Sequence, residues 1–245
     1  MNDLKYIVVT GASRGLGRII SDRLIKAGYN VALCVRSDHH IQESQRSFVE
    51  SSSSMYVYGD ITSSEDLDRI TLEIKDWSGG KIDGLINNAG VAHGGLIQAT
   101  KVDVIKDIFN VNLFSVIELT QRLHRYLRRA PAASIVNISS ISSIYLEQGQ
   151  VAYGVSKAAL NALTKVMARE YASQNISVNC ILPALLDVGM SAEMDKNAMQ
   201  EQLSKMATNG AIPAKDVIDL VMYLLESAGN SITGQLVRLD NGMPF

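Results

Sequence analysis

Residues 10–17 read Thr-Gly-Ala-Ser-Arg-Gly-Leu-Gly, and they stand between an apolar, strand-like run at 6–10 and a helical pattern at 16–27. Gly11, Gly15 and Gly17 allow a tight turn that lets backbone N–H groups approach a ligand closely. A helix that begins here directs the positive end of its dipole at the same place, which favours a bound pyrophosphate. A plain strand-to-helix turn is the alternative, but the position of this turn at the first such junction favours a nucleotide site.

Strand-like and helical segments alternate along the rest of the chain. Strands are expected at 6–10, 30–35, 55–58, 82–86, 134–138, 176–181 and 235–239. Helices are expected at 16–27, 41–50, 64–77 with Ser64 as its cap, 102–129 with an irregularity near its start, 153–173 and 214–227. Strands separated by helices of this length imply right-handed crossovers and parallel pairing. We therefore predict one doubly wound α/β (Rossmann) domain over residues 1–245, with a mostly parallel seven-stranded sheet flanked by helices.

Composition excludes several other classes of protein. The chain has 245 residues, of which 23 are basic and 25 acidic, and the resulting net charge of −2 argues against binding to nucleic acid. Two cysteines, Cys34 and Cys180, are too few for a disulfide framework or a zinc site, so no metal is expected. No apolar stretch reaches the ~18 residues of a membrane span, and the start of the chain shows no leader pattern. We expect a cytoplasmic protein that does not associate with membranes.

The spacing of the turn, T-G-x-x-x-G-x-G, resembles that of the short-chain dehydrogenase/reductase family. Further motifs follow in the family's order, so the resemblance covers essentially the whole chain. Asn87-Asn88-Ala89-Gly90 matches the family's N-N-A-G motif, which supports the sheet and lines the cofactor cleft, and Asp60-Ile61 matches the position whose acid contacts the adenine amine. The resemblance thus implies a dinucleotide site formed by Gly11, Ser13, Arg14, Gly15, Leu16, Gly17, Asp60, Ile61, Asn88, Ala89 and Gly90.

The end of the second expected strand indicates which dinucleotide binds. An NAD site usually has an acid here that binds the ribose 2′-hydroxyl, but this chain has Val35 followed by Arg36. Arg14 lies inside the glycine turn, so two guanidinium groups would stand on either side of the ribose, where they could hold a 2′-phosphate. Either arginine alone would fit an ordinary solvated surface. Together with the missing acid, they predict NADP(H).

Tyr153 and Lys157 form a Y-x-x-x-K pair, which on a helix places the two side chains one turn apart on the same face. A free phenol has a pKa near ~10 and exchanges protons poorly at neutral pH. A nearby ammonium group favours the phenolate and is expected to lower the pKa of Tyr153. The spacing alone is common in amphipathic helices, so the interpretation depends on the surrounding residues.

The family's other catalytic residues are also present. The family places its serine thirteen residues before the tyrosine, which selects Ser140 over three neighbours that fit a polar loop, Ser139, Ser142 and Ser143. Asn112 matches the asparagine that holds a water linking Lys157 to solvent, in preference to Asn110. The resemblance implies hydride transfer between a nicotinamide and a carbonyl/alcohol pair, with Tyr153 exchanging the proton and Lys157 also binding the nicotinamide ribose. Ser-His-Asp hydrolysis is a poor alternative because no G-x-S-x-G elbow is present.

Two motifs depart from the family pattern. After the sixth strand the family reads P-G-x-x-x-T, whereas this chain has Pro183, Ala184 and Val188 at these positions. Pro183 is kept as a cofactor contact. The added methyl of Ala184 and the missing hydroxyl of Val188 are expected to weaken cofactor binding, since one lost hydrogen bond costs ~1 kcal/mol. Near the C-terminus, Asn241 stands where a second glycine is common.

Residues 184–212 are expected to form a flap over the active site. The methionines of this segment either adapt to apolar ligands or form the packed stripe of a helix; they are Met190, Met194, Met199 and Met206. His93, Leu146, Glu147 and Gln150 flank the catalytic segments and are candidates for the lining of the substrate pocket.

By overall resemblance the nearest relatives are 3-oxoacyl-carrier-protein reductases, which offer basic residues to an acidic carrier protein. Arg125, Arg128 and Arg129 fit that role or a solvated helix end, while the second basic position is Gln174 here. A sugar, a small alcohol or a polyketide-like ketone therefore stays an alternative substrate, and a non-catalytic NADP-binding sensor an alternative function. The resemblance also implies a homotetramer or homodimer, paired through residues 214–245.

Overall fold

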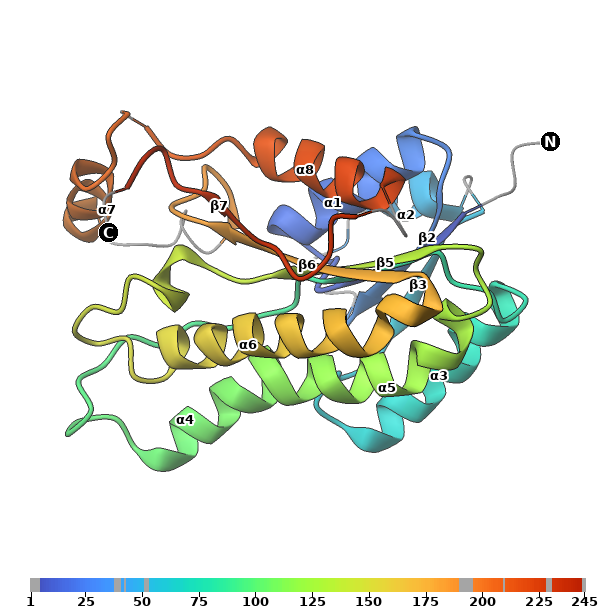
Figure 1. Cartoon of the computed structure of the whole chain (residues 1–245), viewed down its shortest axis with the longest axis horizontal. Helices are drawn as coiled ribbons and strands as arrows, with labels where there is room; N and C mark the ends of the chain where they lie inside the picture. The colour runs from blue at the N-terminus through green and yellow to red at the C-terminus, as the bar shows by residue number, and fades with distance from the viewer. Residues whose placement is uncertain are drawn as a thin grey trace.

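Seven strands form one sheet, and every neighbouring pair of the described strands runs parallel. The computed structural model describes residues 5–37, 41, 43–50, 53–189, 196–208, 210–227 and 231–243. The strand order is β3-β2-β1-β4-β5-β6-β7 (Figure 1). The strands are β1 (Tyr6–Thr10), β2 (Asn30–Val35), β3 (Met55–Tyr58), β4 (Gly84–Asn87), β5 (Ala133–Ile138), β6 (Ile176–Pro183) and β7 (Leu236–Leu239). The predicted doubly wound fold is confirmed, with a sheet that is parallel throughout.

Helices cover both faces of this sheet (Figure 1). One face carries α1 (Gly15–Lys26), α2 (Glu43–Glu50) and α8 (Ala214–Glu226). The other face carries α3 (Ser64–Trp77), α4 (Val102–Phe109), α5 (Ser115–Leu127) and α6 (Tyr153–Tyr171). A further short helix, α7 (Lys196–Ser204), stands apart from both layers at the left of Figure 1. Among the helices that the structure describes, none has the length and apolar character needed to cross a lipid bilayer.

The buried residues of β1 show why the sheet needs helices on both sides. Ile7 and Val9 belong to a buried apolar cluster that includes residues of α1 and α8. Val8 belongs to a second buried cluster, together with residues of α3, α5 and α6. Successive side chains of a strand point to opposite faces. An unbroken apolar run is therefore the pattern that a sheet covered on both faces requires.

The strand order reverses between β1 and β4. From β1 the sheet continues to β2 on one side, and from β4 it continues to β5 on the other. The connections of the two halves diverge at this point, which leaves a crevice outside the carboxyl ends of the strands. The glycine turn follows β1 directly and Asn88 follows β4, so both segments lie at this crevice.

A chain of hydrogen-bonded, buried polar side chains runs from β4 through β5 to α6. Asn87 of β4 and Asn137 of β5 are register partners, and Asn87 Nδ2 donates to Asn137 Oδ1 at 2.8 Å. Asn137 Nδ2 donates to Thr164 Oγ1 of α6 at 2.9 Å. The Thr164 hydroxyl in turn donates to the carbonyl oxygen of Leu160 at 2.9 Å. These bonds fix α6, which begins at Tyr153, against the carboxyl ends of β4 and β5.

Some element boundaries differ from the sequence-based predictions. The cap of α3 is Ser63 rather than Ser64, because Ser63 has the extended backbone that a cap requires and its Oγ accepts from Asp66 N at 3.2 Å. The predicted irregularity in the helix at 102–129 is a π-helical segment, Asn110–Phe114, and it lies in the middle rather than near the start. β6 continues to Pro183, beyond the predicted end at 181.

Candidate active site

The glycine turn packs directly against the segment that follows β4. Gly11 has a φ of +65°, and a Cβ at this residue would stand 2.9 Å from Ala89 Cα. A Cβ on Gly17 would overlap Asn88 Nδ2 and the carbonyl oxygen of Gly11. The turn can therefore approach Asn88 and Ala89 only because both positions lack a side chain.

Hydrogen bonds tie the ends of β1 and β4 together. Thr10 Oγ1 accepts from Asn88 N and from Ala89 N, both at 3.0 Å. Asn88 Nδ2 returns a bond to the carbonyl oxygen of Thr10 at 2.9 Å. Two of the segments that the sequence predicted to bind a dinucleotide are thus brought together at one edge of the sheet.

The first turn of α1 offers backbone donors to a ligand. Arg14 is the N-cap residue, and its side chain makes no capping hydrogen bond to the helix. The first N–H groups of a helix have no acceptor within the helix, and its dipole favours an anion there. Leu16 is buried beneath the turn, while Ser13 is partly exposed. The helix end therefore has the chemistry of a phosphate site.

The two predicted 2′-phosphate ligands lie at neighbouring strand ends. Ala12 N donates to the carbonyl oxygen of Cys34 at 3.3 Å, which holds the glycine turn against the end of β2. Arg14 and Arg36 follow these two residues, and both side chains are exposed. Val35, at the position where an acid would select NAD, is buried in the apolar core. The placement agrees with two cations beside one ribose.

Asp60 is held rigidly at the end of β3. Its Oδ1 accepts from the backbone N of Thr62 at 2.9 Å and from the Thr62 hydroxyl at 2.7 Å. Its own backbone N donates to Asp66 Oδ2 at 2.7 Å. Asp60 and Ile61 thus stand at the same carboxyl edge of the sheet as the glycine turn.

Asn112 lies in the π-helical segment and joins two parts of the site. Its side chain is fully buried. Asn112 Oδ1 accepts from Val91 N, and Asn112 Nδ2 donates to the carbonyl oxygen of Val91, both at 2.9 Å. Asn112 Nδ2 also donates to Ser156 Oγ at 2.9 Å. The amide therefore connects the segment after β4 to α6, one residue before Lys157.

Lys157 is buried at the carboxyl end of β5. Its Nζ donates to the carbonyl oxygen of Ile138 at 2.8 Å. Burial lowers the pKa of Lys157 to about 8. A Cβ built on Gly90 would stand 3.3 Å from Lys157 Nζ and 3.4 Å from Asn112 Oδ1. The missing side chain of Gly90 thus keeps open the space that Lys157 and Asn112 share.

Ser140 and Tyr153 face each other across the start of α6. Ser140 is extended, and its Oγ accepts from Ser142 N at 3.1 Å. Burial raises the pKa of Tyr153, and a side-chain hydrogen bond with Ser140 opposes the rise. We expected Lys157 to lower this pKa. The structure gives the opposite sign because burial is the larger effect and the Lys157 ammonium is directed to Ile138.

The neighbouring serines have structural hydrogen bonds. Ser139 Oγ donates to the carbonyl oxygen of Lys157 at 3.2 Å. Ser143 Oγ donates to the carbonyl oxygen of Ser140 and accepts from Asn161 Nδ2 at 2.7 Å. The hydroxyls of Ser139 and Ser143 therefore hold the loop in place. The Ser140 side chain, in contrast, makes a hydrogen bond with Tyr153.

With the geometry of the glycine turn and of Asn112, Ser140, Tyr153 and Lys157 described, comparison with known proteins shows which family the chain belongs to. The model of the short chain dehydrogenase family matches residues 5–199. The chain belongs to the short-chain dehydrogenase/reductase family.

Several relatives and solved structures resemble nearly the whole chain, and one relative resembles two thirds of it. The 3-oxoacyl-acyl-carrier-protein reductase FabG of Vibrio harveyi is 28% identical over 239 residues, which cover 98% of this chain and 97% of the relative. The corresponding Thermotoga maritima protein is 32% identical over 67% of each chain. A dehydrogenase/reductase from Sinorhizobium meliloti has a TM-score of 0.88 at 27% identity, covering 98% of this chain and 95% of that one. A Burkholderia cenocepacia short chain dehydrogenase in complex with NADP has a TM-score of 0.87 at 28% identity, covering 98% and 97%.

The segment after β6 reaches both the glycine turn and α8. Pro183 is buried at the end of β6. Asp187 Oδ1 accepts from Ala214 N at 2.9 Å and so caps α8. A Cβ on Gly15 would stand 3.1 Å from Gly189 Cα, which places Gly189 beside the N-terminus of α1. Val188 packs against the apolar core.

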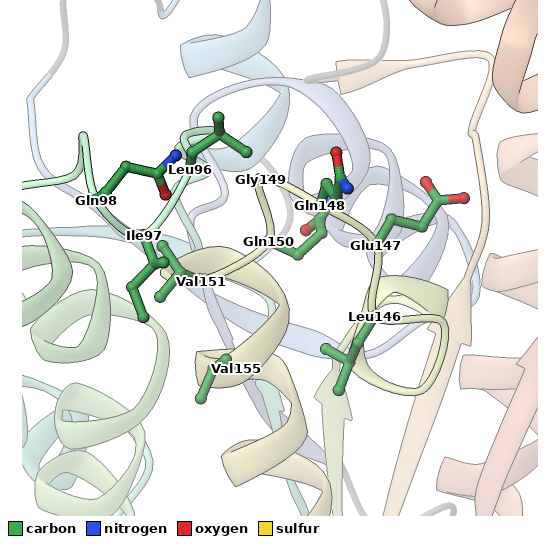
Figure 2. A pocket seen from close by; sticks show the side chains of 10 residues that line it. All are labelled: Leu96, Ile97, Gln98, Leu146, Glu147, Gln148, Gly149, Gln150, Val151 and Val155. Atoms are coloured by element: carbon green, nitrogen blue, oxygen red, sulfur yellow. The ribbon is translucent and has the colours of Figure 1, made fainter.

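A pocket of about 500 Å³ lies beside the loop that joins Ser140 to Tyr153 (Figure 2). Three predicted pocket residues, Leu146, Glu147 and Gln150, line it, whereas His93 is not in its lining. No sequence motif identifies the other lining residues, which are Leu96, Ile97, Gln98, Gln148, Gly149, Val151 and Val155. Only their positions in the sequence, shortly after the N-N-A-G segment or close to Tyr153, indicate that they could lie near the site. Of the flap methionines, Met190 and Met194 lie outside the described residues, and Met206 is buried.

The basic residues of α5 lie far from this pocket within the dehydrogenase/reductase chain. Arg125 is in the last turn of α5, and Arg128 and Arg129 follow it. They precede β5, so they stand at the amino edge of the sheet, opposite the catalytic edge. Gln174 Oε1 accepts a hydrogen bond from His124 Nε2 at 2.6 Å. These residues cannot reach a substrate at the site of their own chain.

The close approach at Gly17 yields a stability prediction. Gly17→Ala should lower the free energy of unfolding by about 2–3 kcal/mol or prevent folding, because the new methyl overlaps Asn88 and Gly11. Gly94→Ala is the matched control, since a Cβ there meets no atom within 4 Å. Urea unfolding measures both variants. Equal stabilities of the two variants would contradict the packing described here.

Proposed function

We propose that the chain is an NADP(H)-dependent ketoreductase that reduces a ketone to a secondary alcohol, or catalyses the reverse reaction. The convergence of Ser140 and Tyr153 at the carboxyl edge of the sheet, with Lys157 one turn further along α6, carries the proposal. The resemblance to 3-oxoacyl-acyl-carrier-protein reductases supports a 3-oxoacyl-type thioester or a related carbonyl compound as substrate.

The residues present fit a nicotinamide dinucleotide. Gly11 and Gly17 lack the Cβ atoms that would close the cradle, and the N-cap residue of α1 beside it makes no side-chain capping bond to the first N–H groups. The pyrophosphate would be held by the turn at 11–17, the 2′-phosphate by Arg14 and Arg36, and the adenine by Asp60 and Ile61. The rest of the dinucleotide site would be lined by Asn88, Ala89, Gly90 and Pro183. Tyr153 and Lys157 would lie at the nicotinamide ribose.

Each catalytic side chain then has a defined task. Bound NADPH supplies the hydride. Ser140 Oγ holds the substrate carbonyl oxygen beside the Tyr153 phenol, and Tyr153 gives its proton to that oxygen in reduction or takes it in oxidation. Lys157 Nζ would hold the ribose hydroxyls and would pass a proton back to Tyr153. Asn112 fixes the segment at Val91 and borders the space beside Lys157, where a water could link Lys157 to solvent.

The pocket lining supports an uncharged, partly apolar substrate. Five of its residues are aliphatic, three are glutamines and one is glycine, and Glu147 is the one charged residue among those given for it. A carrier-bound acyl chain fits this chemistry, and so does a free polyketide-like ketone. A sugar or small-alcohol dehydrogenase is the alternative, favoured by the three amide side chains.

The assembly and location also remain predictions. We propose a homotetramer or homodimer that pairs through the C-terminal surface, where Tyr223 of α8 is 53% exposed. Docking of a carrier protein to Arg125, Arg128 and Arg129 would then take place at the site of a neighbouring subunit, since these residues lie opposite their own. A cytoplasmic location stays a prediction.

Replacing the phenol tests the reaction. Tyr153→Phe should lower ketone-dependent NADPH oxidation by about 10²–10⁴-fold, because it removes the proton donor, while NADPH binding stays within about threefold. Tyr171→Phe, at the other end of α6, is the matched control and should keep wild-type turnover. Absorbance of NADPH with a panel of ketones measures the rates. Wild-type turnover in Tyr153→Phe would contradict the role of Tyr153 as proton donor. If the wild type reduces no ketone in the panel, the alternative function, a non-catalytic NADP-binding sensor, is favoured.

Removing one guanidinium tests the cofactor preference. Arg36→Ala should weaken NADPH binding by about tenfold or more, since a charged hydrogen bond contributes about 1.5–3 kcal/mol. NADH binding should change by less than about threefold, because NADH has no 2′-phosphate. Arg128→Ala, at the opposite edge, is the control. Titration of each variant with NADPH and with NADH measures the two affinities. An equal loss of affinity for NADH and NADPH in Arg36→Ala would contradict the assignment of Arg36 to the 2′-phosphate.

The pKa of Lys157 predicts an upper pH limit. Since this pKa lies at about 8, the ammonium is lost as the pH rises through that value. The kcat/KM for ketone reduction should therefore fall above pH 8. Lys157→Arg keeps its charge, so the fall near this pH should disappear from its profile even if its maximal rate is lower. A wild-type profile that stays flat from about pH 7 to about 9.5 would count against the role of Lys157.

A further inference from the structure

An ion cluster joins the predicted flap to the loop between Ser140 and Tyr153. Lys205 follows α7 directly, and its Nζ stands 2.6 Å from Glu147 Oε1 and 3.2 Å from Glu201 Oε1. Glu201 is four residues earlier, so that contact is local to α7. Glu147 is 58 residues away in the chain, so its contact with Lys205 connects two separate segments.

Glu147 lies at the edge of the pocket. It lies in the loop whose ends are Ser140 and Tyr153, and it lines the pocket. In Figure 2 its carboxylate points away from Ile97 and Val155. Lys205 therefore contacts Glu147 at the rim of the pocket, where α7 approaches the catalytic loop.

Partial burial strengthens this contact. The side chain of Lys205 is 21% exposed and that of Glu147 is 30% exposed. Charges partly shielded from water attract each other more strongly than fully exposed charges do. The hydrogen bond to Glu147 raises the pKa of Lys205, and Glu201 adds to the rise, so the lysine stays protonated across the physiological range.

The C-terminal segment holds the residues that follow Lys205. Asn241 adopts a φ of +50°, a conformation that asparagine tolerates better than most residues. Its carbonyl oxygen accepts from Ala207 N at 2.9 Å and from Thr208 N at 3.2 Å, and its Nδ2 donates to the carbonyl oxygen of Gly210 at 3.0 Å. The asparagine that replaces a common glycine thus anchors the base of the flap. Lys205 stands between this anchored base and α7.

We propose that the Glu147–Lys205 ion pair is a clasp that holds α7 against the catalytic loop, and that both residues are positioning residues that set substrate affinity. With the base of the flap fixed by Asn241, breaking the pair releases α7 from the rim of the pocket. Proton transfer at Tyr153 does not involve either side chain, so the clasp acts on KM and leaves kcat nearly unchanged. The kinetic half of this proposal rests on the proposed function, and the structural half does not.

Hydrogen exchange of the backbone amides of α7 tests the structural half. Glu147→Gln and Lys205→Met should each speed exchange in residues 199–204 by about two- to fivefold, the range expected for a partly exposed ion pair. Glu201→Gln breaks only the local contact and should change exchange by less than about twofold. The reversed pair, E147K with K205E, should return exchange close to the wild-type rate. Unchanged exchange in both single variants, or no rescue by the reversed pair, would overturn the clasp.

Salt and kinetics supply two further readouts, and the split between KM and kcat is the one that a merely structural role would not move. Raising NaCl from about 0.05 to about 0.5 M should speed α7 exchange in the wild type and not in Lys205→Met, because salt screens the pair. With a ketone that the wild type reduces, both single variants should raise KM about two- to fivefold at a kcat within about twofold. A lower kcat at unchanged KM would refute the positioning role. If the wild type reduces no ketone, the proposed function fails, and the exchange experiment alone decides the clasp.

Discussion

The hydroxyl of Thr10 accepts hydrogen bonds from two successive backbone N–H groups at the end of β4, and the whole site depends on this contact. Parallel strands at a switch point have no ladder bonds beyond their carboxyl ends, so something else must hold the two diverging segments together. Thr10 and the Asn88 amide do this from both sides. The glycine turn can then lie on Asn88 and Ala89, and the N-terminus of α1 faces the same crevice as the segment from β4.

The π-helical segment has a comparable effect on the catalytic half of the site. A wider helical turn is unfavourable compared with α-helix, and such segments often occur at functional sites. Here the wider turn directs Asn112 inward, where its amide satisfies both backbone groups of Val91 as well as the Ser156 hydroxyl. The bonds of one side chain thus set the distance between the segment after β4 and the helix that carries Lys157.

The sequence predicts the fold well because its signals are local. Apolar runs such as residues 30–35 have the length of a buried strand, and the structure has β2 at the same residues. The glycine spacing likewise finds the turn, whereas Ser140 is selected by the resemblance to the family, and its side chain does meet Tyr153. Signals of this kind depend on neighbours within a few residues, which a single chain displays directly.

The features that the sequence did not reveal depend on contacts between distant residues. The pKa of Tyr153 rises because of burial, which no spacing records, and the Lys157 ammonium turns to a carbonyl oxygen that any residue at position 138 would supply. The partner of Glu147 is equally hidden, since Lys205 is one of many lysines on helix ends. The sequence marks Asn241 only as a departure from a glycine, because its bond to Gly210 depends on the three-dimensional structure.

The pairing of Asn87 with Asn137 has a consequence for folding. A slip of one residue between β4 and β5 would turn the two side chains to opposite faces of the sheet. Each amide would then be buried without its partner, at a cost of about 1–3 kcal/mol apiece. Apolar neighbours such as Ile86 and Val136 tolerate several alignments, whereas the amide pair tolerates one. The amide pair therefore disfavours misaligned pairing of β4 and β5. The same contact aligns the carboxyl ends of the two strands, where the candidate active site lies.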